Sequence, residues 1–165
     1  MPISQSLLPE MKQEGASTRR MLEAVPFDNP GWKPHEKSMN LQHLAHHLAE
    51  LTGWTSMIIH SNDYDFAKTS EQQAPPANKE ELLKLYDDTL ARAIKDVENV
   101  TDETLMTNWS LRNGETIYFT LPKVSMLRIN MNHIIHHRGQ LSVYLRLNNI
   151  KVPGVYGPTA DDPKM

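Results

Sequence analysis

Residues 132–140, Asn-His-Ile-Ile-His-His-Arg-Gly-Gln, place three imidazoles within five residues of a long stretch with helical apolar periodicity. His133 and His137 are four residues apart, so on a helix their side chains lie on one face, about one turn from each other. At that spacing, two ring nitrogens can reach one metal ion. The stretch therefore predicts both a helix and a pair of metal ligands.

A second cluster, made of His43, His46 and His47, lies on another segment with helical periodicity. At about 100° per residue, His47 falls on the edge of an apolar stripe that includes Leu44, and His43 lies at its boundary. His46 points nearly opposite, beside Glu50. We therefore expect His47 to face inward and the two clusters to form a metal site between two helices.

Length and composition favour one domain that spans residues 1–165. With 165 residues and 39% hydrophobic content, the chain can bury one substantial core. A net charge of -3 gives no electrostatic reason to expect nucleic acid or an anionic membrane as a partner. The chain has no cysteine, so a metal would have to be held by nitrogen and oxygen ligands.

No secretory leader or membrane span is evident in the sequence. The N-terminus lacks a basic region followed by an apolar run, and no segment approaches the roughly 18 uninterrupted apolar residues of a span. We therefore expect a soluble, cytoplasmic protein.

Periodicity and capping residues predict an all-α, four-helix bundle. Helices are expected over about 6–25 and over about 40–59, the second with Ser38 or Asn40 as its N-cap. Two further helices are expected from an N-cap at Asn78 to about Val97 and from an N-cap at Thr120 to about Asn148. Residues 61–77 are polar and predict a long crossover loop. Alternation around Asn113-Gly114, within residues 109–119, predicts a small extended excursion or hairpin before the last helix.

The last predicted helix is apolar on nearly all sides. Met131 and Ile135 lie almost opposite the face of His133, which favours a homodimer through that surface. The alternative is that the 61–77 loop or the 150–165 tail covers it within one chain. Arg138 also points away from the predicted site, so we expect it in a surface or subunit-interface ion pair.

The predicted site consists of His47, His133 and His137 around one divalent transition ion, with water or substrate in the remaining positions. The alternative is that ordinary hydrogen bonds satisfy these histidines. Gln140 and Asn130 lie on the same side and could orient a ligand. Neither helix offers a carboxylate with the geometry of a general base, so the catalytic residues are unknown.

Much of the chain resembles the DinB-like proteins, also called DinB/YfiT-like metalloenzymes. The resemblance is carried by residues 13–20, 44–54 and, most specifically, 132–146. It implies an up-down-down-up four-helix bundle, often dimeric, with one histidine from the second helix and an H-x-x-x-H pair from the last helix holding zinc or nickel. On this chain those positions are His47, His133 and His137.

The resemblance implies a reaction class by analogy. Characterised relatives include thiol-dependent transferases that use low-molecular-weight thiols such as bacillithiol or mycothiol, and a mycothiol-dependent isomerase. The expected function is a metal-dependent thiol transferase acting on a small-molecule substrate. The alternatives are a metal-dependent hydrolase that uses metal-bound water, and a non-enzymatic metal-binding module of a stress response.

Overall fold

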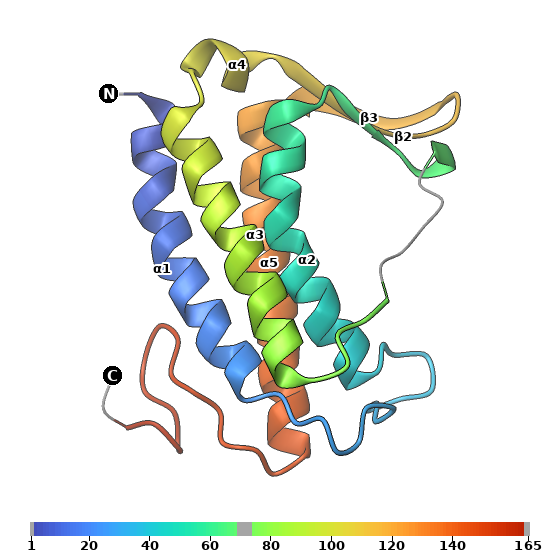
Figure 1. Ribbon diagram of the computed structural model, residues 1–165, viewed down its shortest axis with the longest axis vertical. Helices are drawn as coiled ribbons and strands as arrows, with labels where there is room; N and C mark the ends of the chain where they lie inside the picture. Colours follow the sequence, from blue (N-terminus) through green and yellow to red (C-terminus); the bar gives the residue numbers. More distant parts are fainter. Residues whose placement is uncertain (1, 69–73, 164–165) are drawn as a thin grey trace.

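The structure of the protein, a computed structural model, describes residues 2–68 and 74–163. Its described part is mostly helical, with four long helices side by side and a short helix and a small sheet at one end (Figure 1). In chain order the elements are α1 (Ile3–Glu23), α2 (Leu41–His60), β1 (Asp63–Asp65), the 3-10 helix η1 (Phe66–Lys68), α3 (Lys79–Asn99), α4 (Asp102–Met106), β2 (Asn108–Asn113), β3 (Thr116–Pro122) and α5 (Lys123–Leu147). The prediction of a helical chain is confirmed, and the sheet is a small addition to it.

The long helices run in two directions. α1 and α5 lead away from the sheet end of the molecule, whereas α2 and α3 lead toward it (Figure 1). α2 packs on α3 and α5, and α1 packs on the same two helices. One hydrophobic cluster around Leu44, Tyr86 and Leu141 fills the end away from the sheet, and a second around Ile58 and Trp109 fills the other. The face of α2 that carries His47 is thereby held against α5.

Local capping explains where two of the long helices begin. Asn40 accepts a hydrogen bond from the backbone N–H of His43 and so caps α2. Asn78 accepts from the N–H of Glu81, whose carboxylate accepts in turn from the N–H of Ala77. Both N-caps supply acceptors for backbone N–H groups that have no partner inside the helix. The capping prediction at Asn78 is confirmed, and of the two candidates for α2, Ser38 and Asn40, the cap is Asn40.

The predicted cap at Thr120 is wrong. Thr120 lies in β3, and its hydroxyl pairs with that of Ser110 on β2 at 2.7 Å. β3 continues to Pro122, and α5 begins at Lys123 without a side-chain cap. A threonine two residues before a proline suits a strand end as well as a helix start, and strand pairing decides between the two.

The sheet contains one predicted hairpin and one strand that the sequence does not reveal. β2 and β3 are antiparallel and turn at Gly114, whose φ of +59° favours glycine. β1 pairs in parallel with β2 and lies inside the stretch predicted as a loop over 61–77. Three residues carry too little alternation to signal a strand. Residues 69–73 of that predicted loop lie outside the described residues.

Arg138 lies in the interior, so the prediction of a surface or subunit-interface ion pair is wrong. The residue is only 2% exposed, and its guanidinium lies 2.6 Å from the carboxylate of Glu14 on α1. It also donates to the hydroxyls of Thr18 and Tyr156. The described part of the tail thus lies back on the body of the protein, where Tyr156 completes this buried network.

α1 covers the apolar face of α5 through which the sequence predicts a homodimer. Met131 is buried and Ile135 is half-buried, in the same hydrophobic cluster as Leu7 and Met11 of α1. The expectation that these side chains await a partner subunit is therefore wrong. A helical wheel gives the angle of a side chain on its own helix but not the identity of the neighbouring helix. The homodimer itself stays a prediction.

Among the described residues, no helix is long and apolar enough to cross a membrane.

The Arg138–Glu14 pair generates a prediction about stability. Arg138→Met leaves the Glu14 carboxylate buried without its counter-charge, which costs about 3–5 kcal/mol of unfolding free energy. The double variant Glu14→Leu/Arg138→Met removes both charges and is expected to be more stable than Arg138→Met alone. Urea denaturation of the three proteins measures the difference. A double variant no more stable than the single one would contradict this account of the pair.

Candidate metal centre

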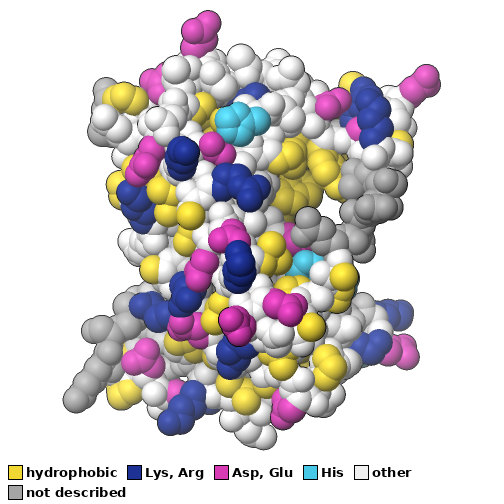
Figure 2. Space-filling view, viewed as in Figure 1, with side chains coloured by type: hydrophobic (Ala, Val, Ile, Leu, Met, Phe, Trp, Pro, Cys, Tyr) yellow, Lys and Arg dark blue, Asp and Glu magenta, His cyan; other side chains and the backbone are white. Residues whose placement is uncertain are grey.

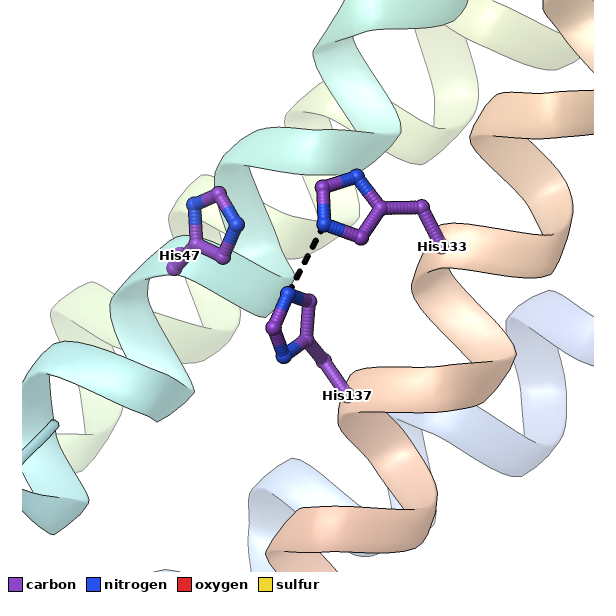
Figure 3. A group of neighbouring side chains, drawn as sticks. All are labelled: His47, His133 and His137. Carbon is purple, nitrogen blue, oxygen red and sulfur yellow. Dashed lines mark hydrogen bonds between the residues drawn. The ribbon is translucent and has the colours of Figure 1, made fainter. Parts of the chain in front are cut away.

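The packing of α2 on α5 brings together the three histidines that the sequence predicts. His47 projects from α2, and His133 and His137 project from successive turns of α5, with all three rings directed toward a common point (Figure 3). One nitrogen of each ring lies within 4.8 Å of the other two. The Nε2 atoms of His133 and His137 are 2.8 Å apart. Among residues 2–68 and 74–163, this is the one such group of three potential ligands.

The site lies at the boundary between the core and the solvent. His137 is buried, His47 is half-buried and His133 is exposed. Leu44 and Leu48, which flank His47 on α2, are fully buried and close the inner side. The histidines are therefore fixed on one side by the core, while the side of His133 stays open to a small molecule.

The electrostatic surroundings keep the three rings uncharged. Burial, followed by the nearby rings of His137 and His133, lowers the pKa of His47 from 6.5 to about 4. Loss of hydration is also the main cause that lowers the pKa of His133 and of His137. At neutral pH each ring is consequently a neutral imidazole with a free lone pair, which is the form that binds a metal ion.

Gln140 fixes the orientation of the His137 ring. Its side-chain oxygen lies 2.7 Å from Nδ1 of His137, and its amide nitrogen lies 3.0 Å from Nε2 of His136. An amide oxygen only accepts hydrogen bonds, so Nδ1 of His137 carries the proton and Nε2 keeps the lone pair that faces the cluster. This is the support that metal-binding histidines usually receive from a neighbouring side chain.

The observed spacing fits a transition ion. Three imidazole nitrogens at about 2.0–2.1 Å from a tetrahedral ion lie about 3.3 Å from one another. The present separations, from 2.8 Å up to 4.8 Å, bracket that value, so small side-chain rotations are enough. Three neutral nitrogen donors with no thiolate suit borderline ions better than Ca²⁺ or Mg²⁺. The three residues could therefore hold one metal ion.

The neighbouring histidines lie outside the cluster. His46 lies beside Glu50 as predicted, with its Nε2 3.4 Å from that carboxylate, but it is buried, which the sequence does not reveal. His43 and His136 are exposed. The sequence therefore clusters six histidines on these two helices, and the structure brings three of them together at the candidate site.

Asn130 connects the two helices that carry the three histidines. Its side chain is buried and donates a hydrogen bond of 2.9 Å to the carbonyl of Leu51 on α2. Leu51 follows His47 by one turn, and Asn130 precedes His133 by one turn. Asn130 therefore ties the two helices together beside the three rings.

Comparison with known proteins shows a family relationship over nearly the whole chain. The sequence model of the DinB family matches residues 1–164. The uncharacterized protein YrdA of Bacillus subtilis is 24% identical over 153 residues, which cover 90% of this chain and 85% of YrdA. The uncharacterized protein YjoA of the same organism is 28% identical over 130 residues, which cover 78% of this chain and 80% of YjoA.

Solved structures share the fold. The crystal structure of YjoA, a DinB-like protein of Bacillus subtilis, superposes with a TM-score of 0.68 at 19% identity and covers 96% of this chain and 99% of YjoA. A DinB-like protein from Bacillus cereus gives the same TM-score at 22% identity and covers 92% of this chain and 97% of that protein. At these identities the likeness concerns the fold.

The geometry predicts which histidines matter for metal affinity. His47→Ala, His133→Ala and His137→Ala each remove a proposed ligand and should weaken zinc binding at least about tenfold. His46→Ala and His136→Ala are matched neighbours that should keep most of the affinity, although His46→Ala should lower stability because the ring is buried. Competition with a chromophoric chelator measures each constant. Equal losses at His46 and His47 would show that α2 presents another face to the ion.

The lowered pKa of His47 also predicts a pH dependence of the metal-free fold. Between pH 6.5 and about 4, the unfolded chain binds a proton at this ring that the folded protein excludes. The unfolding free energy should therefore fall as the pH drops through this window, and His47→Gln should lose that component. Urea denaturation with a chelator at pH 7 and pH 5 compares the two proteins. Equal pH responses would contradict the lowered pKa.

Proposed function

The chain belongs to the DinB family, and on this premise we propose that it is a metal-dependent enzyme that transfers a low-molecular-weight thiol to a small electrophile. The observation that carries the proposal is the convergence of His47, His133 and His137 at a half-open edge of the helices. Three imidazoles leave at least one coordination position for a ligand, as in catalytic rather than purely structural sites. The substrate would approach from the exposed side, past His133.

Each part of the site has a distinct task in this proposal. A bound divalent ion would supply Lewis acidity that favours the thiolate form of a thiol beside it. Gln140 keeps the ring of His137 in the ligating tautomer, and Asn130 keeps α2 at the distance from α5 that the three rings require. The buried leucines beneath His47 exclude water from the inner side.

Zinc and nickel are the ions that we propose. The donor set contains three neutral imidazoles and neither thiolate nor carboxylate, and imidazole nitrogen suits both ions.

The alternatives have less support. A hydrolase that uses metal-bound water needs a group to accept a proton, and no carboxylate belongs to the group of ligands that the described residues form. A non-enzymatic metal-binding module of a stress response would need only the ligands. Its distinguishing property would be metal binding without turnover.

The proposal extends to assembly and location. We propose that the four long helices form the up-down-down-up bundle that the resemblance implies, in a single cytoplasmic domain that forms a homodimer. Ile129, Val143 and Leu147 are exposed on α5 and offer apolar surface for a subunit contact.

A transfer assay tests the proposed reaction. Zinc- or nickel-loaded protein is mixed with dithiothreitol and 1-chloro-2,4-dinitrobenzene, where the thiolate sulfur bonds to the ring carbon, chloride leaves and the thiol proton goes to the buffer. Because the chain has no cysteine, the protein itself adds no thiol. We expect a rate at least about tenfold above that of the free ion, and a return to that background in His137→Ala.

The control is His136→Ala, which removes a neighbouring ring while keeping the proposed ligands. It should retain most of the activity. A rate no higher than that of the free ion with each of several small thiols would overturn the transferase proposal. The zinc-affinity measurements would still decide whether the protein binds a metal ion.

A further inference from the structure

One exposed histidine lies beside the three proposed ligands without belonging to them. His43 precedes His47 by four residues on α2, so their side chains lie on one face with Cβ atoms about 5–6 Å apart. At about 100° per residue, His43 is turned about 40° from His47, and buried Leu44 and Leu48 lie on the other side. The charge of His43 contributes to the lowered pKa of His47, after burial and the two rings from α5. His43 therefore borders the half-open side of the site.

The opposite directions of α2 and α5 place His43 at a polar end of the site. α2 leads toward the sheet and α5 leads away from it, so His43 and Gln140 both lie on the side of the ligands away from the sheet (Figure 1). Gln140 already contacts Nδ1 of His137 and Nε2 of His136. An amide accepts hydrogen bonds but is no base at neutral pH. Of these two polar side chains, His43 is the one that can take up a proton.

A carboxylate on α2 is the competing proton acceptor. Glu50 follows His47 by three residues and is half-buried. Its Oε1 atom lies 3.4 Å from Nε2 of buried His46, which is turned about 100° from His47. This contact directs the Glu50 carboxylate away from the three rings. An imidazole also titrates near neutral pH, which suits proton transfer better than a carboxylate does. His43 is therefore the better-placed base.

The surroundings of His43 suit a residue that takes up and releases a proton in every cycle. Its backbone N–H donates to the side chain of Asn40 at 2.7 Å, which fixes the start of α2. The ring itself is exposed, so water can receive the proton. Figure 2 shows a histidine side chain at the surface beside α2, on the side of the helix away from α3. His43 thus combines a fixed backbone with access to solvent.

We propose that His43 accepts the proton of the thiol that binds beside the three histidines. The assignment rests on the proposed thiol-transfer function. An ordinary thiol is mostly protonated at neutral pH, so its proton must leave before the sulfur can attack. The three ligands cannot receive it, because a ring nitrogen that binds an ion has no lone pair left for a proton.

Proton transfer precedes substitution in the proposed step. The S–H proton moves to a ring nitrogen of His43, and the sulfur keeps the electron pair of that bond. The sulfur then bonds to the carbon of the electrophile, and the leaving group departs with its bonding electrons. The imidazolium of His43 finally gives the proton to the buffer, which restores the neutral ring.

Thiolate formation tests the proposal without any electrophile. Cobalt(II)-loaded protein is mixed with mercaptoethanol at neutral pH in a stopped-flow spectrometer, where thiolate-to-cobalt charge-transfer absorption reports the thiolate. We expect His43→Ala to slow this step on the order of 100-fold. With trifluoroethanethiol, which is much more acidic, the loss should shrink to less than about tenfold, because less depends on the protein base. Free imidazole in solution should restore part of the rate that is lost with mercaptoethanol.

The controls separate a proton acceptor from a ligand or a structural residue. His35→Ala truncates another exposed histidine, in the connection between α1 and α2, and should leave the rate unchanged. The zinc affinity of His43→Ala should stay close to that of the wild type, because no ligand is removed. A loss of zinc affinity of about tenfold or more would overturn the proposal by making His43 a ligand. Equal losses with both thiols, no rescue by imidazole, or a loss in Glu50→Gln with none in His43→Ala would also overturn it.

The outcomes for His43 and for the transferase can be told apart. Thiolate formation that depends on His43, without transfer to the electrophile, would support the role of His43 and count against the transferase proposal alone. Transfer that is insensitive to His43→Ala would overturn the role of His43 alone. A wild-type protein on which no thiolate forms would overturn both.

Discussion

The packing of α2 against α5 is the interaction on which the candidate site depends. α5 alone supplies two imidazoles at helical spacing, and the third nitrogen comes within reach only because α2 lies alongside. Fully buried Leu44, Leu48 and Leu141 hold the helices together, and each such side chain contributes about 1.5–3 kcal/mol through burial. Apolar packing, rather than an ion, therefore forms the site, in contrast to small zinc domains that fold only with metal. The ligands are preorganised, so the binding energy of an ion need not be spent on ordering the chain.

Buried polar contacts fix how the helices are aligned once apolar packing has brought them together. Hydrophobic contact is non-directional, whereas a buried hydrogen bond that is lost leaves polar groups without partners and costs free energy. Asn130 bonds the carbonyl of Leu51 one turn from the histidines, and Tyr86 bonds the carbonyl of Gly15 at 2.8 Å. At Gly15, an added Cβ would lie 2.9 Å from the terminal side-chain carbons of Leu90, so a larger residue there would have to displace the Leu90 side chain. A slip of either helix pair would break these bonds. The same contacts that specify the fold thus hold the three rings in register.

Local spacing explains how much of this the sequence could reveal. The four long helices, the caps at Asn40 and Asn78 and the convergence of the three histidines follow from periodicity and residue type within single segments. The helix that covers the far face of α5 could not be derived this way, because burial of Arg138 and Met131 depends on α1, more than a hundred residues away in the chain. The strand β1 depends on pairing between distant segments for the same reason. Local patterns determine which side chains share a face, and tertiary packing determines what that face meets.

The central claim is that His47, His133 and His137 hold one divalent ion together. X-ray absorption spectroscopy of protein loaded with one equivalent of zinc measures this directly, because scattering from imidazole rings identifies the number of histidine ligands and their distances. The account predicts three imidazole nitrogens at about 2.0–2.1 Å, with one or more lighter ligands completing the shell. A shell with one imidazole or none, or a protein that retains no zinc after gel filtration, would contradict it.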